Sequence, residues 1–306
     1  MATPTTFFDL QVNGYAGVDF NCDDLTPERA HEACAKLEAD GVGGILATII
    51  TENLETMARR LRRIAELRER DALVRRIIAG IHIEGPFLNE KDGFRGAHPL
   101  DAVRPASADD MRRLLDAAQG LTRIVTLAPE RDPALKVTRM LAERGITVSA
   151  GHCDPSLDEL RAALDAGLTM FTHLGNGCPM LLDRHDNIIQ RALSLSDHLT
   201  ISFIADGVHV PWFALANYLR VAGLGRSVIV SDAIAPAGLG PGRHRFARWD
   251  LEIGEDRVAR APDGSHLIGS ACPMRLAAQN LRQHLGLTES EVRRLTVLNP
   301  RSAIKR

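Results

Sequence analysis

The sequence predicts an α/β fold, a TIM barrel in which eight parallel strands are each followed by a helix. Short apolar runs bounded by turn residues alternate with helical patterns along all 306 residues. Eight such runs precede the last helical pattern, which is the strand number of this barrel. No G-x-G-x-x-G motif follows the first run, which disfavours an open nucleotide-binding sheet. We therefore expect one barrel domain over residues 1–306.

The apolar runs and the patterns between them give the expected elements in order. Strands are expected at residues 7–12, 44–50, 77–84, 123–127, 146–152, 168–173, 200–205 and 227–232. Helices are expected at residues 27–39, 54–70, 108–118, 133–144, 156–166, 187–195, 211–222 and 274–284. Capping signals support the helix starts, for example Thr26 before Pro27. Helix ends are expected before Gly41, Gly145 and Gly167.

One insertion interrupts the alternation. Residues 235–270 are rich in Gly and Pro and contain an alternating segment at 249–259. We expect a loop with a β-hairpin over the barrel mouth, between the eighth strand and the last helix. The basic run at 59–76 is more typical of the solvated face of a long helix than of a binding patch.

The composition excludes several classes of protein. A net charge of -2 gives no electrostatic case for nucleic acid or an anionic membrane. No apolar run approaches the roughly 20 residues that span a bilayer, and the first residues lack the pattern of a signal peptide. The five cysteines are odd in number and include no C-x-x-C pair, which favours free thiols and a cytoplasmic location.

One acidic and two imidazole side chains end three of the expected strands. Glu84 ends the third strand, His152 the fifth and His173 the sixth. The carboxyl ends of the strands in a parallel barrel form the mouth where active sites lie. A carboxylate and two imidazoles suit Zn²⁺ or a similar ion, with a fourth position open for water. Such water loses a proton near neutral pH, so the pattern predicts a hydrolytic metal site.

Further polar residues are expected at the same mouth. Gln11 lies at the end of the first strand, His209 follows the seventh, and Asp232 ends the eighth, where it can accept and return a proton. A single histidine at either position would be more typical of a locally hydrogen-bonded side chain than of a metal ligand. The metal site is favoured because several polar residues share the same strand-end position. Cys153 and Cys178 are alternative thiolate ligands, although cysteine is more often a small buried hydrophobic residue.

Nine segments form a more specific pattern: DLQVNGYAGVDFN (9–21), HIEGPFLN (82–89), GAHP (96–99), TLAPE (126–130), VSAGHC (148–153), THLGN (172–176), ADGVHV (205–210), SDAIAPAG (231–238) and LIGSACPM (267–274). In this order they resemble the amidohydrolase superfamily and, within it, the N-acetylglucosamine-6-phosphate deacetylases. The resemblance covers the barrel nearly end to end. It implies a TIM barrel and metal-dependent hydrolysis of the acetamide of an amino sugar.

The resemblance also implies a ligand set. Glu84, His152 and His173 match the ligands of one divalent metal ion, for which we expect Zn²⁺, with Fe, Co or Mn as alternatives. The superfamily often begins with two histidines that bind a second metal. Gln11 and Asn13 stand at those positions, and because amides are poor zinc ligands, one metal is expected. Gln11 would reach the ion directly or through its water.

The catalytic and substrate-binding residues follow from the same resemblance. Asp232 matches the catalytic acid and base, and His209 the residue that orients the substrate. Arg184 is the natural phosphate partner, with a surface ion pair to Asp183 or Asp186 as the structural alternative. The implied substrate contacts are Ala97, His98, Asn176, Gly177, Arg184, Asp206, His209, Leu267, Ile268 and Gly269. For Asn176 the alternative is a turn residue.

Two departures from the family concern the substrate. The family's small β-sandwich, built from both chain ends, is expected to be absent, and Asn176-Gly-Cys-Pro179 replaces the usual Asn-Ala-Met-Pro. We expect deacetylation of N-acetylglucosamine 6-phosphate by a homodimer. The alternatives are an unphosphorylated N-acyl sugar or another linear or cyclic amide, or a non-catalytic barrel that binds or scaffolds.

Overall fold

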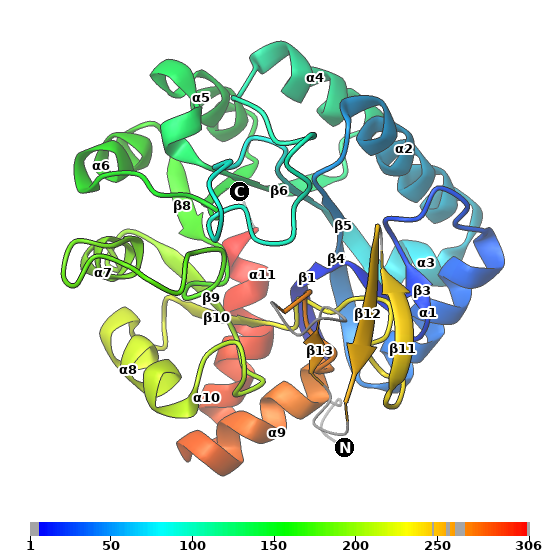
Figure 1. Ribbon diagram of the computed structural model, residues 1–306. Helices are drawn as coiled ribbons and strands as arrows, with labels where there is room; N and C mark the ends of the chain where they lie inside the picture. Colours follow the sequence, from blue (N-terminus) through cyan, green and yellow to red (C-terminus); the bar gives the residue numbers. More distant parts are fainter. Residues whose placement is uncertain (1–5, 247, 255–257, 261–266, 305–306) are drawn as a thin grey trace.

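The computed structural model of the protein describes residues 6–246, 248–254, 258–260 and 267–304. Eight parallel strands form one sheet in the order β1-β4-β5-β6-β7-β8-β9-β10. Figure 1 looks into the barrel that they form, with helices around its outside. The strands are β1 Phe7–Val12, β4 Val42–Ile50, β5 Ile78–Glu84, β6 Thr122–Leu127, β7 Thr147–Ala150, β8 Leu168–Phe171, β9 Thr200–Ile204 and β10 Ser227–Val230. The predicted TIM barrel is confirmed.

The last strand meets the first through side-chain and main-chain hydrogen bonds. The Asp9 carboxylate accepts the Ser231 N–H, with both oxygens within 3.3 Å of that nitrogen. Beyond the ends of both strands, the carbonyl of Ala233 accepts the N–H of Asn13 at 2.7 Å. Burial raises the pKa of Asp9 to about 7, although the hydrogen bonds from Ser231 and from Gln11 favour its ionised form. A buried carboxylate therefore helps to close the barrel.

Amphipathic helices cover the outside of the barrel. They are α1 Pro27–Ala39, α2 Leu54–Arg70, α3 Ala72–Ile77, α4 Ala108–Ala117, α5 Lys136–Glu143, α6 Leu157–Asp165, α7 Ile188–Ser194, α8 Trp212–Ala222 and α9 Met274–Leu285. Six of the nine named here, all but α5, α8 and α9, start with a side-chain cap. Ser156 and Glu159 form a reciprocal capping box at α6. Short 3₁₀ turns, Pro129–Arg131 and Pro133–Leu135, precede α5.

The C-terminal segment closes the amino-terminal end of the barrel. It contains α10 Glu289–Arg293, a π-helical turn and α11 Asn299–Ala303, which lies behind the barrel in Figure 1. Ala303 and Ile304 pack against an apolar floor made of Phe8, Leu10, Leu46, Ile124, Met170, Ile204, Val228 and Val230. The Arg301 guanidinium lies 4.5 Å from the centre of the Phe8 ring. The opposite end is left for binding and chemistry, as in other TIM barrels.

The insertion after β10 contains the expected hairpin. Antiparallel strands β11 Gly242–Phe246 and β12 Trp249–Ile253 pair with each other, and β13 Ala259–Arg260 pairs with β12. In the turn, Arg248 binds Glu52, with Nε 2.7 Å from Oε2, and also binds Asp101 at 3.2 Å. Glu52 and Asp101 follow β4 and β5, so the hairpin lies beside the mouth (Figure 1). Residues 255–257 and 261–266 of the predicted insertion lie outside the described residues.

The structure differs from the sequence prediction at a few boundaries. Strands β7, β8 and β10 end two residues early, so His152, His173 and Asp232 stand in the following loops. The basic run at 59–76 forms two helices, because Asp71 ends α2 and caps α3 with its side chain. The helices after α9 were not predicted. Within the described part of the chain, none of the helices has the length and apolarity needed to cross a bilayer.

Candidate active site

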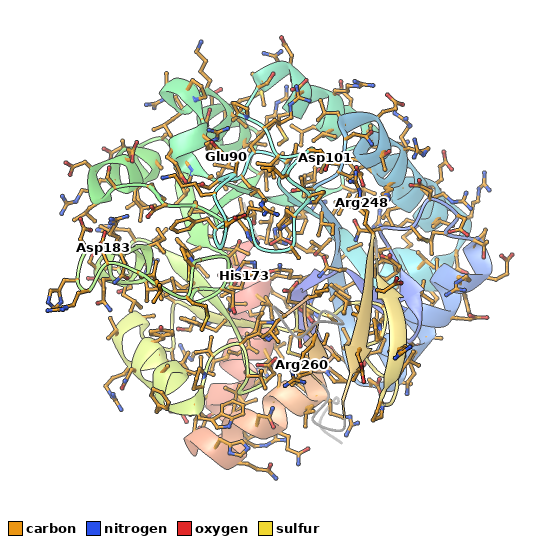
Figure 2. The ribbon with its side chains drawn as sticks, viewed as in Figure 1. Glu90, Asp101, His173, Asp183, Arg248 and Arg260 are labelled. Atoms are coloured by element: carbon orange, nitrogen blue, oxygen red, sulfur yellow. The ribbon has the colours of Figure 1, made fainter. Side chains whose placement is uncertain are left out.

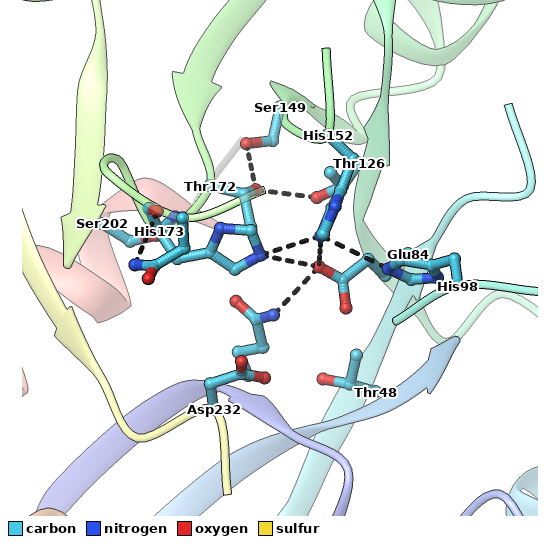
Figure 3. Close-up of polar contacts among 12 residues, drawn as sticks. Thr48, Glu84, His98, Thr126, Ser149, His152, Thr172, His173, Ser202 and Asp232 are labelled. Carbon is cyan, nitrogen blue, oxygen red and sulfur yellow. Dashed lines mark hydrogen bonds and ion pairs between the residues drawn. The ribbon is translucent and has the colours of Figure 1, made fainter. Parts of the chain in front are cut away.

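Three side chains meet at the mouth, above the ends of β5, β7 and β8. Oε1 of Glu84 lies 3.0 Å from Nε2 of His173 and 3.4 Å from Nε2 of His152. The two Nε2 atoms lie 3.2 Å apart. All three residues are buried, and Figure 3 shows them pointing at one another. The structure thus brings together the three ligands that the sequence predicts.

The spacing of these atoms fits a small divalent cation. In a tetrahedral zinc site with bonds of about 2.0–2.1 Å, neighbouring ligand atoms lie about 3.3–3.4 Å apart. The three contacts here span 3.0–3.4 Å. A carboxylate and two imidazoles are also the ligand types that zinc and similar ions prefer. The residues present therefore fit a divalent metal ion.

Glu84 is held in its charged form. Burial opposes its ionisation, but the contacts with His152 and His173 outweigh burial and keep its pKa well below the ordinary value. Conversely, Glu84 raises the pKa of His173 against the effect of burial. Gln11 Nε2 donates to Oε1 of Glu84 at 3.1 Å. Because an ionised carboxylate only accepts, Gln11 must present its N–H rather than its oxygen to Glu84.

The tautomer of His152 is fixed by its other ring nitrogen. Nδ1 lies 2.9 Å from the carbonyl oxygen of Phe94, which can only accept, so Nδ1 carries the hydrogen. In the neutral ring, Nε2 then has its lone pair directed at Glu84 and His173. Hydrogen bonds of this kind orient the histidine ligands of metal sites. His173 differs, because its Nδ1 is buried with no hydrogen-bond partner among the described residues.

A third imidazole lies within reach of the same group. Nε2 of His98 is 3.3 Å from Nε2 of His152, and Glu84, His98 and His152 place ligand atoms within 4.8 Å of one another. Burial, with a contribution from His152, lowers the pKa of His98 to about 3, so the ring is neutral at physiological pH. The sequence predicts only a substrate contact for His98. The position of His98 makes it an alternative to His173 as the third metal ligand.

The backbone is strained where the key side chains project. His152 has φ +52°, His173 φ +33° and Asp232 φ +49°, values in the left-handed region that non-glycine residues seldom adopt. Such strain clusters at functional sites, where the surrounding fold has to impose it. It also explains the early strand ends, because a left-handed residue cannot continue a strand. The turns aim all three side chains into the mouth.

Asp232 lies beside the ligand group, as Figure 3 shows. Desolvation, followed by the charge of Glu84, raises the pKa of Asp232 to about 6. Asn13 Nδ2 donates to Oδ1 of Asp232 at 2.8 Å. Asp232 is therefore a carboxylate with a basicity close to that of histidine, which suits proton transfer near neutral pH.

His209 pairs with Asp206 on the loop after β9. Nδ1 of His209 lies 2.6 Å from Oδ2 of Asp206, and Oδ1 of Asp206 accepts the backbone N–H groups of Val208 and His209. Burial opposes the charge on Asp206, but the hydrogen bond from His209 lowers the Asp206 pKa below its ordinary value. The carboxylate holds Nδ1–H, so Nε2 is the ring nitrogen left for substrate.

The loops of residues 93–98 and 175–178 pack against the ring of His152. A Cβ at Gly177 would lie 2.8 Å from Nδ1 of His152, and one at Gly96 would lie 3.1 Å from Cε1, so larger residues at these glycines would displace the ring. Asn176 uses its Nδ2 on the carbonyl of His173 at 3.1 Å, which is the turn role. Ala97 is partly exposed at this edge of the mouth.

Residues Leu267, Ile268 and Gly269 lie against the Asp232 turn. The carbonyl of Asp232 accepts the N–H of Ser270 at 3.0 Å. Gly269 has φ +54°, and a Cβ there would lie 2.5 Å from the Ile234 side chain. The segment therefore borders Asp232, where the sequence predicts substrate contacts.

Arg184 is not brought to the ligand group. It is exposed in the loop between β8 and α7, and its neighbour Asp183 lies at the rim in Figure 2, while His173 lies near the centre. The alternative ion pair with Asp186 is not formed, because Asp186 binds Arg191, with Nε 2.6 Å from Oδ1. Among the described residues the alternative ion pair between Arg184 and Asp183 is not formed either.

A buried polar layer beneath the site was not predicted. Nε2 of His82 lies 2.7 Å from Oγ1 of Thr126, which lies 2.8 Å from Oγ1 of Thr172. Ser149 extends this chain, and Ser202 Oγ accepts the N–H of His173 at 2.8 Å. Burial lowers the pKa of His82 to about 4, so the layer is uncharged at His82. The alternation of inward-facing and outward-facing residues along each strand could have predicted that these polar side chains face the barrel interior.

The cysteines near the mouth behave as the sequence suggests. Cys153 is buried and Cys178 partly buried, and both are free thiols. Burial raises the pKa of both thiols, well above the ordinary value for Cys153. Neither is grouped with the candidate ligands among the described residues. A neutral thiol is a poor metal ligand, so neither cysteine joins Glu84, His152 and His173 as a candidate ligand.

Comparisons with known proteins agree with the geometry. No family model matches the chain. An N-acetylgalactosamine-6-phosphate deacetylase of Escherichia coli O157:H7 is 30% identical over 294 residues, which cover 96% of this chain and 76% of that protein. The human N-acetylglucosamine-6-phosphate deacetylase is 34% identical over 309 residues, covering 96% and 72%.

Solved structures of the same enzymes resemble the fold. A mutant N-acetyl-D-glucosamine-6-phosphate deacetylase of Mycobacterium smegmatis, in complex with N-acetyl-D-glucosamine 6-phosphate, has a TM-score of 0.88 and 30% identity over 98% of this chain and 77% of that one. The Thermotoga maritima enzyme has a TM-score of 0.85 and 27% identity over 97% and 77%. The chain therefore belongs to the N-acetylglucosamine-6-phosphate deacetylase family of metal-dependent amidohydrolases.

Proposed function

We propose that the protein removes the acetyl group of N-acetylglucosamine 6-phosphate and releases acetate and glucosamine 6-phosphate. One observation carries the proposal. Glu84, His152 and His173 place three ligand atoms within 3.4 Å of one another, beside an aspartate whose pKa is raised to about 6. This set combines a cation site with a proton acceptor, which amide hydrolysis requires.

We assign the metal to Glu84, His152 and His173, and we expect Zn²⁺ because the ligands are one carboxylate and two imidazoles. A divalent cation bound there supplies water that is acidic near neutral pH and polarises a carbonyl oxygen. His173 is preferred to His98 because its Nε2 contacts both Glu84 and His152. Gln11 offers Glu84 an N–H, so we propose that it orients this carboxylate and ligates only if its amide turns.

Asp232 moves the proton in this proposal. Its carboxylate accepts the proton of the attacking water, and the resulting acid returns it to the nitrogen of the sugar as the C–N bond breaks. A pKa of about 6 places Asp232 between a strong acid and a strong base, so both transfers are feasible near neutral pH. No other group has to take up the proton between the two steps.

His209 orients the acetamide. With Nδ1–H bound to Asp206 at 2.6 Å, the ring is fixed and presents Nε2 to the mouth. When Nε2 is protonated, it donates a hydrogen bond to the carbonyl oxygen and stabilises the negative charge that develops there.

The phosphate of the substrate needs a cationic side chain as its partner. We propose that Arg184 binds it from a neighbouring copy of the chain in a homodimer. Two facts support this: Arg184 is exposed and forms no ion pair within the part of the chain that the structure describes, and Met180 and Leu181 on the same loop are 99% and 91% exposed. An interface would cover these apolar side chains. Met180→Lys should then give monomers in sedimentation, and an unchanged dimer would refute the placement of the interface.

N-acetylgalactosamine 6-phosphate is the second candidate substrate. The relative from Escherichia coli O157:H7 carries that name and is 30% identical, close to the identity of the glucosamine enzymes. The two sugars differ only in the configuration at C4, so the acetamide chemistry is the same. A comparison of kcat/KM for the two sugar phosphates decides between them.

Acetate release from each sugar phosphate tests the proposed function. The metal-loaded protein should hydrolyse at least one of them faster than unphosphorylated N-acetylglucosamine. Absence of acetate with both, from protein shown to contain metal, would refute the proposal. A preference for the unphosphorylated sugar would refute the assignment of the phosphate.

A further inference from the structure

We propose that Asn13 is a positioning residue for Asp232. Its side-chain amide fixes one oxygen of the Asp232 carboxylate and leaves the other to exchange the proton. This inference deepens the proposed function and rests on it for the role of Asp232. The sequence places Asn13 only where related enzymes often have a metal-binding histidine. The structure gives it a different contact.

The contact is a short hydrogen bond to the catalytic carboxylate. Nδ2 of Asn13 lies 2.8 Å from Oδ1 of Asp232. When Asp232 is ionised it only accepts hydrogen bonds, so the nitrogen of the Asn13 amide faces it and the amide oxygen points elsewhere. That oxygen is buried and has no hydrogen-bond partner among the described residues. Among the described residues, Asp232 is therefore the hydrogen-bond partner of the Asn13 side chain.

The main chain fixes the distance between the two residues. The carbonyl of Ala233, which follows Asp232, accepts the N–H of Asn13 at 2.7 Å and the N–H of Gly14 at 3.2 Å. Val12 and Ala233 form a parallel bridge at the same place. The backbones of both residues are therefore tied together beside the side-chain bond, which limits the rotamers that Asp232 can adopt.

The main chain of Asn13 is itself held by the turn of residues 20–21. Its carbonyl accepts the N–H of Phe20 at 3.0 Å and Nδ2 of Asn21 at 3.4 Å. The fully buried Asn21 also donates to the carbonyl of Thr48 at 2.9 Å and accepts the N–H of Ile50 at 2.9 Å. These contacts link Asn13 to the end of β4, so the amide is preorganised before substrate binds.

The two oxygens of the Asp232 carboxylate have different roles in this proposal. Oδ1 keeps the hydrogen bond from Asn13 throughout the reaction. Oδ2 takes the proton as an O–H bond of the attacking water breaks, and gives it to the amine nitrogen as the C–N bond breaks. Asn13 neither gains nor loses a proton, so it acts only through Asp232. Its loss should lower kcat and leave the KM for the sugar phosphate and the metal content nearly unchanged.

The test compares Asn13→Ala with Asn89→Ala. Asn89 is a matched control, because its Nδ2 also donates to a carboxylate, that of Glu130, at 2.8 Å, and the residue is equally buried. Loss of a hydrogen bond to a charged group corresponds to a decrease of about 10- to 100-fold in kcat for Asn13→Ala. Asn89→Ala removes the bond to Glu130 and the bond that Asn89 Oδ1 accepts from the Lys91 N–H, and it keeps the backbone bond to His152. It should keep kcat within about twofold, since neither lost bond involves Asp232.

Three measurements separate a positioning role from a structural one. In Asn13→Ala, metal content and KM should match the wild type, while the acid limb of the kcat profile moves to higher pH because Asp232 loses a stabilising donor. Unchanged kcat, or equal decreases in both asparagine variants, would overturn the inference. So would loss of the metal together with the activity.

A crystal structure of Asn13→Ala tests the inference independently of turnover. A changed orientation of the Asp232 carboxylate supports the positioning role, and an unchanged one contradicts it. If the wild type hydrolyses neither sugar phosphate, the proposed function fails, while this comparison still decides whether Asn13 holds Asp232.

Discussion

The Nε2 atoms of His152 and His173 lie 3.2 Å apart, and both face the same oxygen of Glu84. His152 carries its hydrogen on Nδ1, which donates to Phe94, so its Nε2 is an acceptor in the neutral ring. Two imidazole nitrogens and one carboxylate oxygen converge on a single point. A divalent cation satisfies all three at once. This relationship is the basis of the metal assignment.

The metal assignment predicts different effects of two histidine substitutions. His173→Asn should reduce bound metal to a small fraction of the wild-type amount, because it removes an atom that contacts both other ligands. His98→Asn should keep the metal and raise the KM for the substrate. Elemental analysis of the purified variants checks this. Retained metal in His173→Asn with loss in His98→Asn would reassign the third ligand to His98.

Asp232→Asn removes the proposed proton acceptor. General acid–base catalysis typically contributes about 10²–10⁴-fold, so kcat should decrease by that factor while bound metal is retained. Protonated Asp232 cannot accept the proton of the water, and its pKa without metal is about 6. Because a bound cation lowers this pKa, activity of the metal-loaded wild type should fall with decreasing pH at a point below about 6. A variant with wild-type kcat would exclude Asp232 from the mechanism.

Arg184→Ala tests recognition of the phosphate. Loss of a charge-assisted hydrogen bond should raise the KM for the sugar phosphate about 10- to 100-fold. The KM for unphosphorylated N-acetylglucosamine should not change, which is the internal control. Arg184→Lys should recover part of the affinity, since it keeps the charge and loses the planar fork. An equal effect on both sugars would show that Arg184 does not bind the phosphate.

The barrel floor can be perturbed without touching the mouth. Ile124 is fully buried there, so Ile124→Ala should lower the free energy of unfolding by about 2–5 kcal/mol. Leu100→Ala is the control, because the Leu100 side chain is 56% exposed and should contribute little. Thermal or denaturant unfolding of the metal-loaded proteins measures both. If both substitutions lower the free energy of unfolding by the same amount, the assignment of the floor as a packed layer is wrong.

Much of the fold was predictable because barrel strands and helices have distinct periodicities. The bounds of β1, α1 and α2 agree with the prediction to the residue. The ends of β7, β8 and β10 differ from the prediction, because tertiary contacts impose left-handed turns at His152, His173 and Asp232. Propensity alone favours extended conformations in such apolar runs. The C-terminal helices that seal the floor were missed for a related reason, since they are short and depend on packing against the barrel.

The convergence of Glu84, His152 and His173 was predictable from the sequence, and the other contacts of the candidate site were less so. Strand-end positions identified Glu84, His152 and His173 because parallel strands present their ends at one mouth. The approach of His98 to His152 depends on how the loop of residues 93–98 folds back, which no local pattern encodes. The bond between Asn13 and Asp232 joins residues 219 positions apart and requires the closed barrel.

The most direct test of the central claim is acetate release from N-acetylglucosamine 6-phosphate as zinc is added stepwise to the metal-free protein. One cation held by Glu84, His152 and His173 predicts activity that rises linearly and stops rising at about one equivalent per chain. No activity at any amount of zinc, or a rise that continues to two equivalents, would contradict it.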